Sequence, residues 1–238
     1  MATNILSPYQ AGQVYEEEIF GGFENQFEAQ YCKDFLNSTS KGLVLDLACG
    51  DGRHTLRLSE KADYVIAVDL SPNNLRMAWR KCQGKENIAF IEASMLDLPF
   101  RENIFEGIWF SQAFEYIAPD RRLGFLLSAR RILKPRGVLY MSVETWMYPS
   151  LSVSLKELWS NFRLYLYWKL VKRRPLLWGE FLYYLSSEKV GDRISRWHYH
   201  VHTDKWTLLR VLGKSELRRL KLDLHDGYFY ALCERAVT

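Results

Sequence analysis

Residues Val44–Thr55, VLDLACGDGRHT, decide the fold of this chain. The apolar run carries one acidic residue, Asp46, and leads directly into a turn of small residues. Short apolar runs bounded by glycine are typical of buried strands, so the stretch predicts a strand, a tight turn and a helix start. Glycine permits positive φ and the close approach of a ligand, and a helix start offers unpaired N–H groups. The turn is therefore predicted to bind a nucleotide-like ligand.

Further apolar runs follow at a spacing that leaves room for helices between them. They are Tyr64–Asp69, Ile88–Glu92, Ile104–Phe110 and Val138–Val143. Ser71 followed by Pro72 marks a helix start, and Asp120 begins a helix that Lys134–Gly137 ends. Strands that alternate with helices predict a parallel sheet covered on both faces. Such sheets bind ligands at the carboxyl ends of their strands.

The two ends of the chain depart from this pattern. Leu217–Leu224 and Tyr228–Arg235 predict two strands joined by a tight Asp-Gly turn, after a helix that begins at Thr203 and ends at Gly213. These strands would form an antiparallel hairpin at the edge of the sheet. Residues 1–40 predict a helical cover, in which aromatic side chains recur every four residues.

Composition and charge fit one domain over residues 1–238. Apolar residues make up 48% and charged residues 25%, as in ordinary globular proteins, and the net charge of +4 is too small to indicate nucleic acid. Four scattered cysteines are typical of reduced thiols in an intracellular protein. No secretory signal and no apolar run long enough to span a bilayer is visible, so a cytoplasmic location is expected.

Two classes of nucleotide site begin with such a turn. A dinucleotide site needs a third glycine or alanine where this chain has Thr55. Asp69, which ends the next strand, is suited to hold ribose hydroxyls through its carboxylate in either class.

Over residues 40–145 and 203–236, the chain resembles class I S-adenosylmethionine-dependent methyltransferases of the small-molecule type. The stretches that carry the resemblance are VLDLACGDGRHT, VIAVDLSPNNL, ASMLDLPF, IFEGIWFSQAFEYI and RILKPRGVLYMSVE.

This resemblance implies a Rossmann-like, doubly wound and mostly parallel seven-stranded sheet, with S-adenosylmethionine as the cofactor. Ser94 stands where the family usually has an acid that binds the adenine amino group, so a charge-assisted bond would be missing there. Leu70 would lie against the adenine, and Ser111 would close the fourth strand near the transferable methyl group. The implied cofactor-binding residues are Asp46, Ala48, Cys49, Gly50, Gly52, Asp69, Leu70, Ser94, Met95 and Ser111.

Residues 146–202 form an aromatic-rich insertion after the fifth strand. The spacing from Leu151 to Lys169 predicts a helix with one apolar face, and Phe181–Leu185 predicts a second, shorter helix. Three roles stay open: a lid over a small, partly apolar acceptor, a packing or dimer contact, and docking on a membrane surface. In the alternative function, residues 151–185 dock a cofactor-binding protein to a membrane or partner, with a lipid-like substrate or none. The oligomeric state is open.

Methyl transfer needs an acceptor held in line, exclusion of water and removal of any acceptor proton, so the fold alone names no catalytic residue. Three histidines alternate in RWHYHVHT, and an extended segment would point them to one side. No acid or cysteine partner is recognisable from spacing, so no metal site is predicted, and one histidine is a candidate general base. The catalytic candidates are His198, His200 and Glu115, and the predicted acceptor contacts are Tyr15, Gln112, Tyr116 and Trp146.

Overall fold

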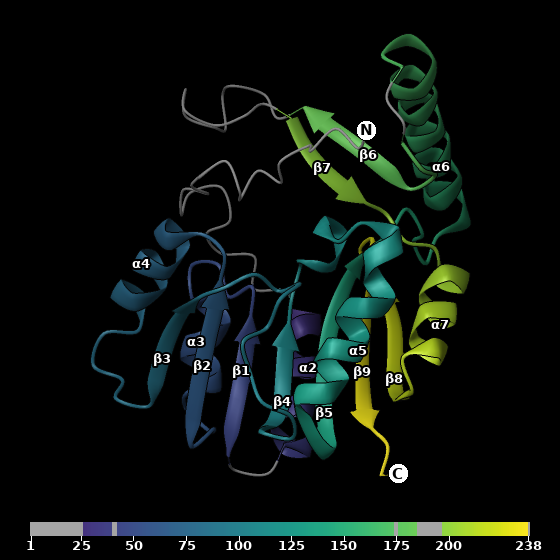
Figure 1. The fold of residues 1–238 in the computed structure, drawn as a ribbon. Coiled ribbons are helices and arrows are strands. Elements are labelled where there is room, and N and C mark those ends of the chain that lie inside the picture. Colours follow the sequence, from purple (N-terminus) through teal and green to yellow (C-terminus); the bar gives the residue numbers. More distant parts are fainter. Residues whose placement is uncertain (1–25, 40–41, 174–175, 185–196, 238) are drawn as a thin grey trace.

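The computed structural model describes residues 26–39, 42–173, 176–184 and 197–237, with only the backbone described for residues 26, 181–184 and 197–199. A seven-stranded sheet in the order β3-β2-β1-β4-β5-β9-β8 forms its centre (Figure 1). The strands are β1 (Leu43–Leu47), β2 (Tyr64–Asp69), β3 (Ile88–Glu92), β4 (Phe105–Phe110), β5 (Leu133–Glu144), β8 (Leu217–His225) and β9 (Tyr228–Arg235). Strands β1 to β5 pair in parallel, and β9 is antiparallel to β5 and to β8. The predicted sheet with its antiparallel C-terminal hairpin is confirmed.

Helices cover both faces of the sheet. Helices α5 (Arg122–Ile132) and α7 (Lys205–Lys214) lie in front of it in Figure 1, and α2 (Gln26–Ser38) and α3 (Arg53–Leu58) lie behind it. Successive strand residues face opposite sides, so Trp109 packs on Phe35 of α2 and Phe110 on Phe125 of α5, with ring centroids 5.3 Å and 4.7 Å apart. Helix α4 (Pro72–Lys81) packs on β2 through Ala78.

A glycine in β4 lets α2 come close to the sheet. A Cβ atom at Gly107 would lie 2.5 Å from Cζ of Phe35 and 2.5 Å from Cγ2 of Thr39. A larger side chain there would require the side chains of Phe35 and Thr39 to move. This close packing fixes the start of α2 beside the carboxyl end of β4.

Several predicted boundaries were wrong. Lys134–Gly137, predicted to separate a helix from a strand, lie inside β5, which begins at Leu133. Asp204, not Thr203, caps α7, because its carboxylate accepts the N–H groups of Trp206 and Thr207 at 2.9 and 3.0 Å. Gly213 lies inside α7, which ends at Lys214. Asp120 lies in a short 3₁₀ turn, η2 (Pro119–Arg121), and α5 begins after it. The predicted Asp-Gly hairpin turn is confirmed, with φ of 45° at Asp226 and 74° at Gly227.

The insertion lies at the carboxyl edge of the sheet (Figure 1). It holds α6 (Leu151–Leu166), a π-helical turn η3 (Tyr167–Val171), and the antiparallel strands β6 (Glu180–Tyr184) and β7 (Trp197–Val201). The second helix predicted at 181–185 was wrong, because these aromatic residues pair as a strand with β7. In the described residues, no helix is long and apolar enough to cross a bilayer.

Candidate functional site

The turn after β1 contains one glycine that packs against α4 and another that faces open space. Ala48, Gly50 and Gly52 have φ of 58°, 55° and 81°, so the chain curves through left-handed conformations. A Cβ atom at Gly52 would lie 2.8 Å from Cα of Ala78 in α4. A Cβ atom at Gly50 would meet nothing within 4 Å. Gly52 is therefore required for packing, whereas Gly50 faces space that a ligand could enter.

Asp69 holds this turn from the neighbouring strand. Its Oδ2 accepts the N–H of Gly50 at 2.9 Å, and its Oδ1 accepts from Ser71 N and Asn74 Nδ2 at 2.8 and 3.2 Å. The side chain is buried, and burial raises the pKa of its carboxyl. Each carboxylate oxygen can accept two hydrogen bonds, so Oδ2 has capacity for another donor besides Gly50.

Asp46 and Thr55 form a second buried contact in the turn. Thr55 Oγ1 donates to Asp46 Oδ2 at 2.5 Å, and both residues are buried. Burial raises the pKa of Asp46 to about 6. The threonine that breaks the dinucleotide pattern thus serves as a partner of the strand carboxylate.

The other predicted cofactor residues extend along the same edge. Cys49 is buried, and its N–H donates to Val68 O at 2.9 Å, while Leu70 is half-buried directly after Asp69. Ala93 N donates to Asp69 O at 3.1 Å, which places Ser94 and Met95 beside the end of β2. Ser94 Oγ accepts the N–H of Leu96 at 3.2 Å, so this serine caps its own turn.

Glu28 of α2 is a site residue that sequence reasoning missed. Its Oε1 accepts hydrogen bonds from Ser111 Oγ and, at 2.9 Å, from the Tyr140 hydroxyl. Its Oε2 lies 3.5 Å from His54 Nε2 and 3.6 Å from Arg53 Nη2. Burial alone would raise the pKa of Glu28. The contacts with His54 and Ser111 outweigh burial and lower this pKa to about 2. An ionised carboxylate therefore joins α2 to the end of β4 and to the start of α3.

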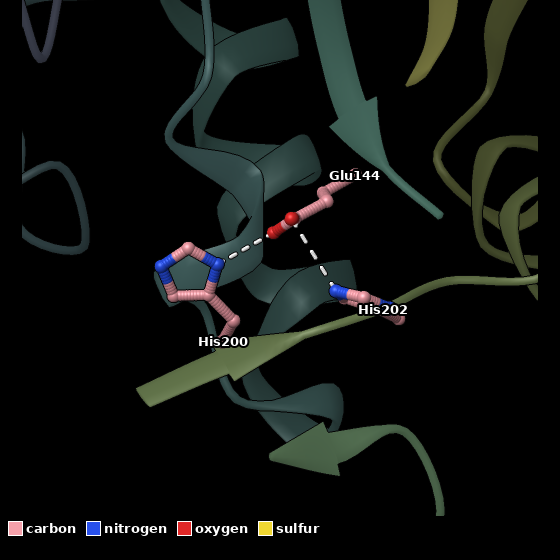
Figure 2. A group of neighbouring side chains, drawn as sticks. All are labelled: Glu144, His200 and His202. Carbon is pink, nitrogen blue, oxygen red and sulfur yellow. Dashed lines mark hydrogen bonds and ion pairs between the residues drawn. The ribbon is translucent and has the colours of Figure 1, made fainter. Parts of the chain in front are cut away.

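A carboxylate and two histidines gather at the end of β5 (Figure 2). His200 Nδ1 donates to Glu144 Oε2 at 2.6 Å, and His202 Nε2 lies 3.3 Å from Glu144 Oε1. Burial alone would raise the pKa of Glu144 and lower that of His200. The contacts between the two outweigh burial, so the pKa of Glu144 is lowered and the pKa of His200 is raised. Glu144 was expected at the ligand-binding edge because it closes the fifth strand, but it was not predicted to be the partner of the histidines.

Glu115 and Tyr116 lie next to this cluster in the short 3₁₀ turn η1 (Phe114–Tyr116). The Tyr116 ring packs edge-on against His200, with centroids 5.1 Å apart. Glu115 is buried, and its Oε2 has no hydrogen-bond partner among the described residues. Burial and the charge of Glu144 raise the pKa of Glu115 to about 8.

The structure describes only some of the remaining residues that were predicted to contact the acceptor or to act in catalysis. Gln112 follows β4 with φ of 49°, and its N–H donates to Ser142 Oγ at 2.7 Å. Trp146 is half-buried, two residues after Glu144. Tyr15 lies outside the described residues. The backbone of His198 pairs with Tyr183 in the β6–β7 ladder, but its side chain also lies outside the description.

Part of the chain is similar in sequence to known methyltransferases. A family described as "Methyltransferase domain" matches residues 44–137. A putative methyltransferase of Bacillus subtilis is 31% identical over 107 residues, which are 44% of this chain and 43% of that protein. A demethylmenaquinone methyltransferase of Clavibacter sepedonicus is 33% identical over 95 residues, 40% of this chain and 38% of that protein. The match thus spans less than half the length of these relatives.

The fold as a whole also occurs in solved structures. A S-adenosylmethionine-dependent methyltransferase of Methanosarcina mazei superposes with a TM-score of 0.67 at 17% identity, over 85% of this chain and 96% of that chain. At this identity the likeness concerns the fold alone.

Proposed function

Because the chain carries a methyltransferase domain of the class I, S-adenosylmethionine-dependent type, we propose that the protein transfers a methyl group from S-adenosylmethionine to a small, partly apolar acceptor. The observation that carries the proposal is the turn after β1. There Gly50 faces open space while its N–H is held by the carboxylate that ends β2. A left-handed glycine beside a buried acid suits a ligand with a ribose and a polar amino-acid end.

The turn residues would bind the cofactor. Asp69 Oδ2, which accepts the Gly50 N–H, would accept a ribose hydroxyl as its second donor. Leu70, Ser94 and Met95 would border the adenine, and Asp46 with Ala48 to Gly52 would surround the methionine part. When bound, S-adenosylmethionine supplies a methyl group on a positively charged sulfur. Glu28, which is ionised and paired with Arg53, would hold Ser111 at the end of β4 beside the transferable methyl group.

The acceptor would lie between the end of β4 and the insertion. Gln112, Tyr116 and Trp146 would contact it there. The Clavibacter relative is named for demethylmenaquinone, which supports an acceptor with an apolar body. Because Glu115 has a pKa of about 8, it is mostly protonated at neutral pH and suits a proton donor. Of the predicted bases, His200 is the best supported, because Glu144 fixes its Nδ1 and proton transfer would run through Nε2.

Calorimetric titration with S-adenosylmethionine and with its demethylated product tests the proposal. We expect saturable binding by the wild type and binding weaker by roughly 1–3 kcal/mol in Asp69→Asn, because the ribose loses a charged acceptor. Asp63→Asn, which changes an exposed acid, is the matched control and should bind as the wild type does. Absence of saturable binding by the folded wild type would refute the proposed function.

The exposed face of α6 favours a second candidate, a contact with an anionic membrane surface. Leu151, Leu155 and Trp159 are 73%, 56% and 62% exposed, and Leu155 and Trp159 line an apolar groove that extends to Trp178. Basic residues follow the helix at 169, 172 and 173. Exposed tryptophan and leucine beside lysine and arginine are typical of helices that lie in the membrane interface. Such a surface would bring the enzyme to lipid-soluble acceptors.

Co-sedimentation with vesicles tests this candidate. We expect binding to vesicles of phosphatidylcholine with phosphatidylserine, less to phosphatidylcholine alone, and a loss in Trp159→Ser. Trp79→Ser is the control, because Trp79 is 57% exposed on α4, away from the insertion. Equal sedimentation of both variants, or none by the wild type, would contradict a membrane role for α6.

A further inference from the structure

Backbone pairing brings three potential metal ligands together at the end of β5. Glu144 is the last residue of β5, His200 lies in β7, and His202 follows β7 directly. Thr203 N donates to Glu144 O at 3.0 Å, and His202 N donates to Gly179 O at 2.9 Å. The first bond joins the histidine segment to the end of β5, and the second joins it to the residue before β6. Both imidazoles point toward the carboxylate (Figure 2).

The donor set is that of a metal site. One ligand atom from each of the three side chains lies within 4.8 Å of the others. Two imidazoles and one carboxylate, with a further position open, are the protein ligands of many catalytic zinc sites. We propose that Glu144, His200 and His202 bind a divalent transition-metal ion, zinc foremost, and that this ion holds an oxygen atom of the methyl acceptor. The role toward the acceptor rests on the proposed function, whereas the ion site itself does not.

Glu144 contacts one histidine through each carboxylate oxygen, and both contacts can be compared with the spacing that zinc requires. Zinc–ligand bonds of about 2.0–2.2 Å at tetrahedral angles separate neighbouring ligand atoms by about 3.3 Å. His202 Nε2 and Glu144 Oε1 are already 3.3 Å apart. His200 Nδ1 and Glu144 Oε2, at 2.6 Å, must separate by less than about 1 Å, which a small side-chain rotation provides.

A second layer of residues supports the site. Asn161 of α6 is 3% exposed, and its Nδ2 lies 3.0 Å from Nδ1 of His202. A half-turn of this amide presents Oδ1 instead, which would accept the Nδ1–H and direct the Nε2 lone pair of His202 to the ion. Arg122 Nη1 donates to Thr203 Oγ1 at 2.6 Å and so holds the residue after His202.

The charges around the cluster also favour a cation. Glu115 Oε2 is buried without a hydrogen-bond partner among the described residues, and its carboxyl is close enough to Glu144 and His200 to interact with both electrostatically. At neutral pH Glu115 is mostly protonated, so the ionised Glu144 carries the excess negative charge of this cluster. A divalent ion between Glu144 and the histidines would neutralise that excess.

The ion would prepare the acceptor for methylation. An O–H group bound to a divalent ion loses its proton to solvent at neutral pH, because the ion lowers its pKa. The methyl carbon–sulfur bond then breaks with its electron pair remaining on sulfur, and the acceptor supplies the pair of the new bond. The sulfonium becomes a neutral thioether, and the acceptor anion becomes neutral. In the competing role of the same residues, His200 takes the proton as a base and no ion is present.

Metal titration of the whole protein tests the inference. The protein is treated with a chelator, freed of it, and titrated with CoCl₂ by visible absorption and with ZnCl₂ by calorimetry. We expect one ion per chain, the visible bands of low-coordinate cobalt, and a Tm that rises with zinc. Glu144→Gln and His202→Ala should lose this binding, and Asn161→Ser should weaken it by about tenfold. His225→Ala is the control, because His225 lies in β8 beside Asp226.

The possible results separate the ion site from the proposed function. Far-UV circular dichroism shows that each variant is folded, and the milder Asn161→Ser keeps the test decisive if a ligand variant does not fold. Wild-type protein that binds cofactor but no stoichiometric ion overturns this inference alone. Ion binding that is unchanged in Glu144→Gln and Asn161→Ser also overturns it. Ion binding lost in those variants, in a protein that binds no cofactor, supports the ion site and refutes the proposed function.

Discussion

Gly52→Ala should mainly destabilise the fold, whereas Gly50→Ala should mainly weaken cofactor binding. Both glycines have positive φ, 55° and 81°, so alanine at either position carries a conformational penalty of about 1–2 kcal/mol. At Gly52 the new Cβ would also lie 2.8 Å from both Cα and Cβ of Ala78. That clash with a helix backbone adds about 1–3 kcal/mol. At Gly50 the new Cβ meets no protein atom within 4 Å.

We therefore expect Gly52→Ala to lower the free energy of unfolding by about 2–5 kcal/mol, and Gly50→Ala by only about 1–2 kcal/mol. Gly50→Ala should instead weaken S-adenosylmethionine binding by about tenfold or more, because its methyl group enters the proposed cofactor space. Urea denaturation measures the first quantity and calorimetric titration the second. Equal destabilisation by the two substitutions, or wild-type cofactor affinity in Gly50→Ala, would refute this reasoning.

Three further substitutions test the buried charges. Glu28 has a pKa of about 2, below its ordinary value of 4.5, so it contributes about 3 kcal/mol of stability above pH 4.5 that is lost as the pH falls toward 2. Glu28→Gln should therefore flatten the acid limb of urea denaturation, and parallel curves would contradict this. Asp46 gives the opposite pH dependence. Because its pKa is raised to about 6, the free energy of unfolding falls as the pH rises from about 4 to 6. Asp46→Asn should remove that fall in the same assay. Arg122→Met removes three donated hydrogen bonds, to Thr203 Oγ1 and to the carbonyl groups of Ile117 and Val201. Urea denaturation should therefore show a loss of at least about 3 kcal/mol, and a loss below about 1 kcal/mol would be inconsistent with those bonds.

Local sequence signals were sufficient for the parallel half of the sheet. Tyr64–Asp69 and Ile88–Glu92 form strands with the predicted bounds, because apolar runs flanked by turn residues have few other ways to be buried. The insertion is different. Phe181–Leu185 was predicted to be a short helix, yet residues 181–184 belong to β6, which pairs with Trp197–Val201. That pairing partner is distant in the sequence, so no local pattern could reveal it.

The site shows the same division between local and long-range information. The turn and Asp69 could be found because a strand, a glycine turn and an acid follow one another closely in the sequence. Glu28 was missed, although it shares the helical face of Tyr31 and Phe35 and is therefore an acid on a buried stripe. Glu144 was missed as the partner of the histidines, because only the folding of the insertion over β5 brings them together.

Two residues with left-handed backbone conformations lie at the sheet edge where the cofactor is proposed to bind. Ala48 and Gln112 follow the adjacent strands β1 and β4, and both have positive φ, at 58° and 49°. A left-handed conformation costs a residue other than glycine about 1–2 kcal/mol and persists only where its surroundings impose it. Here the bonds from Cys49 N to Val68 O and from Gln112 N to Ser142 Oγ impose it. Strain of this kind concentrates at functional sites, and these two residues flank the place where the methyl donor would meet its acceptor.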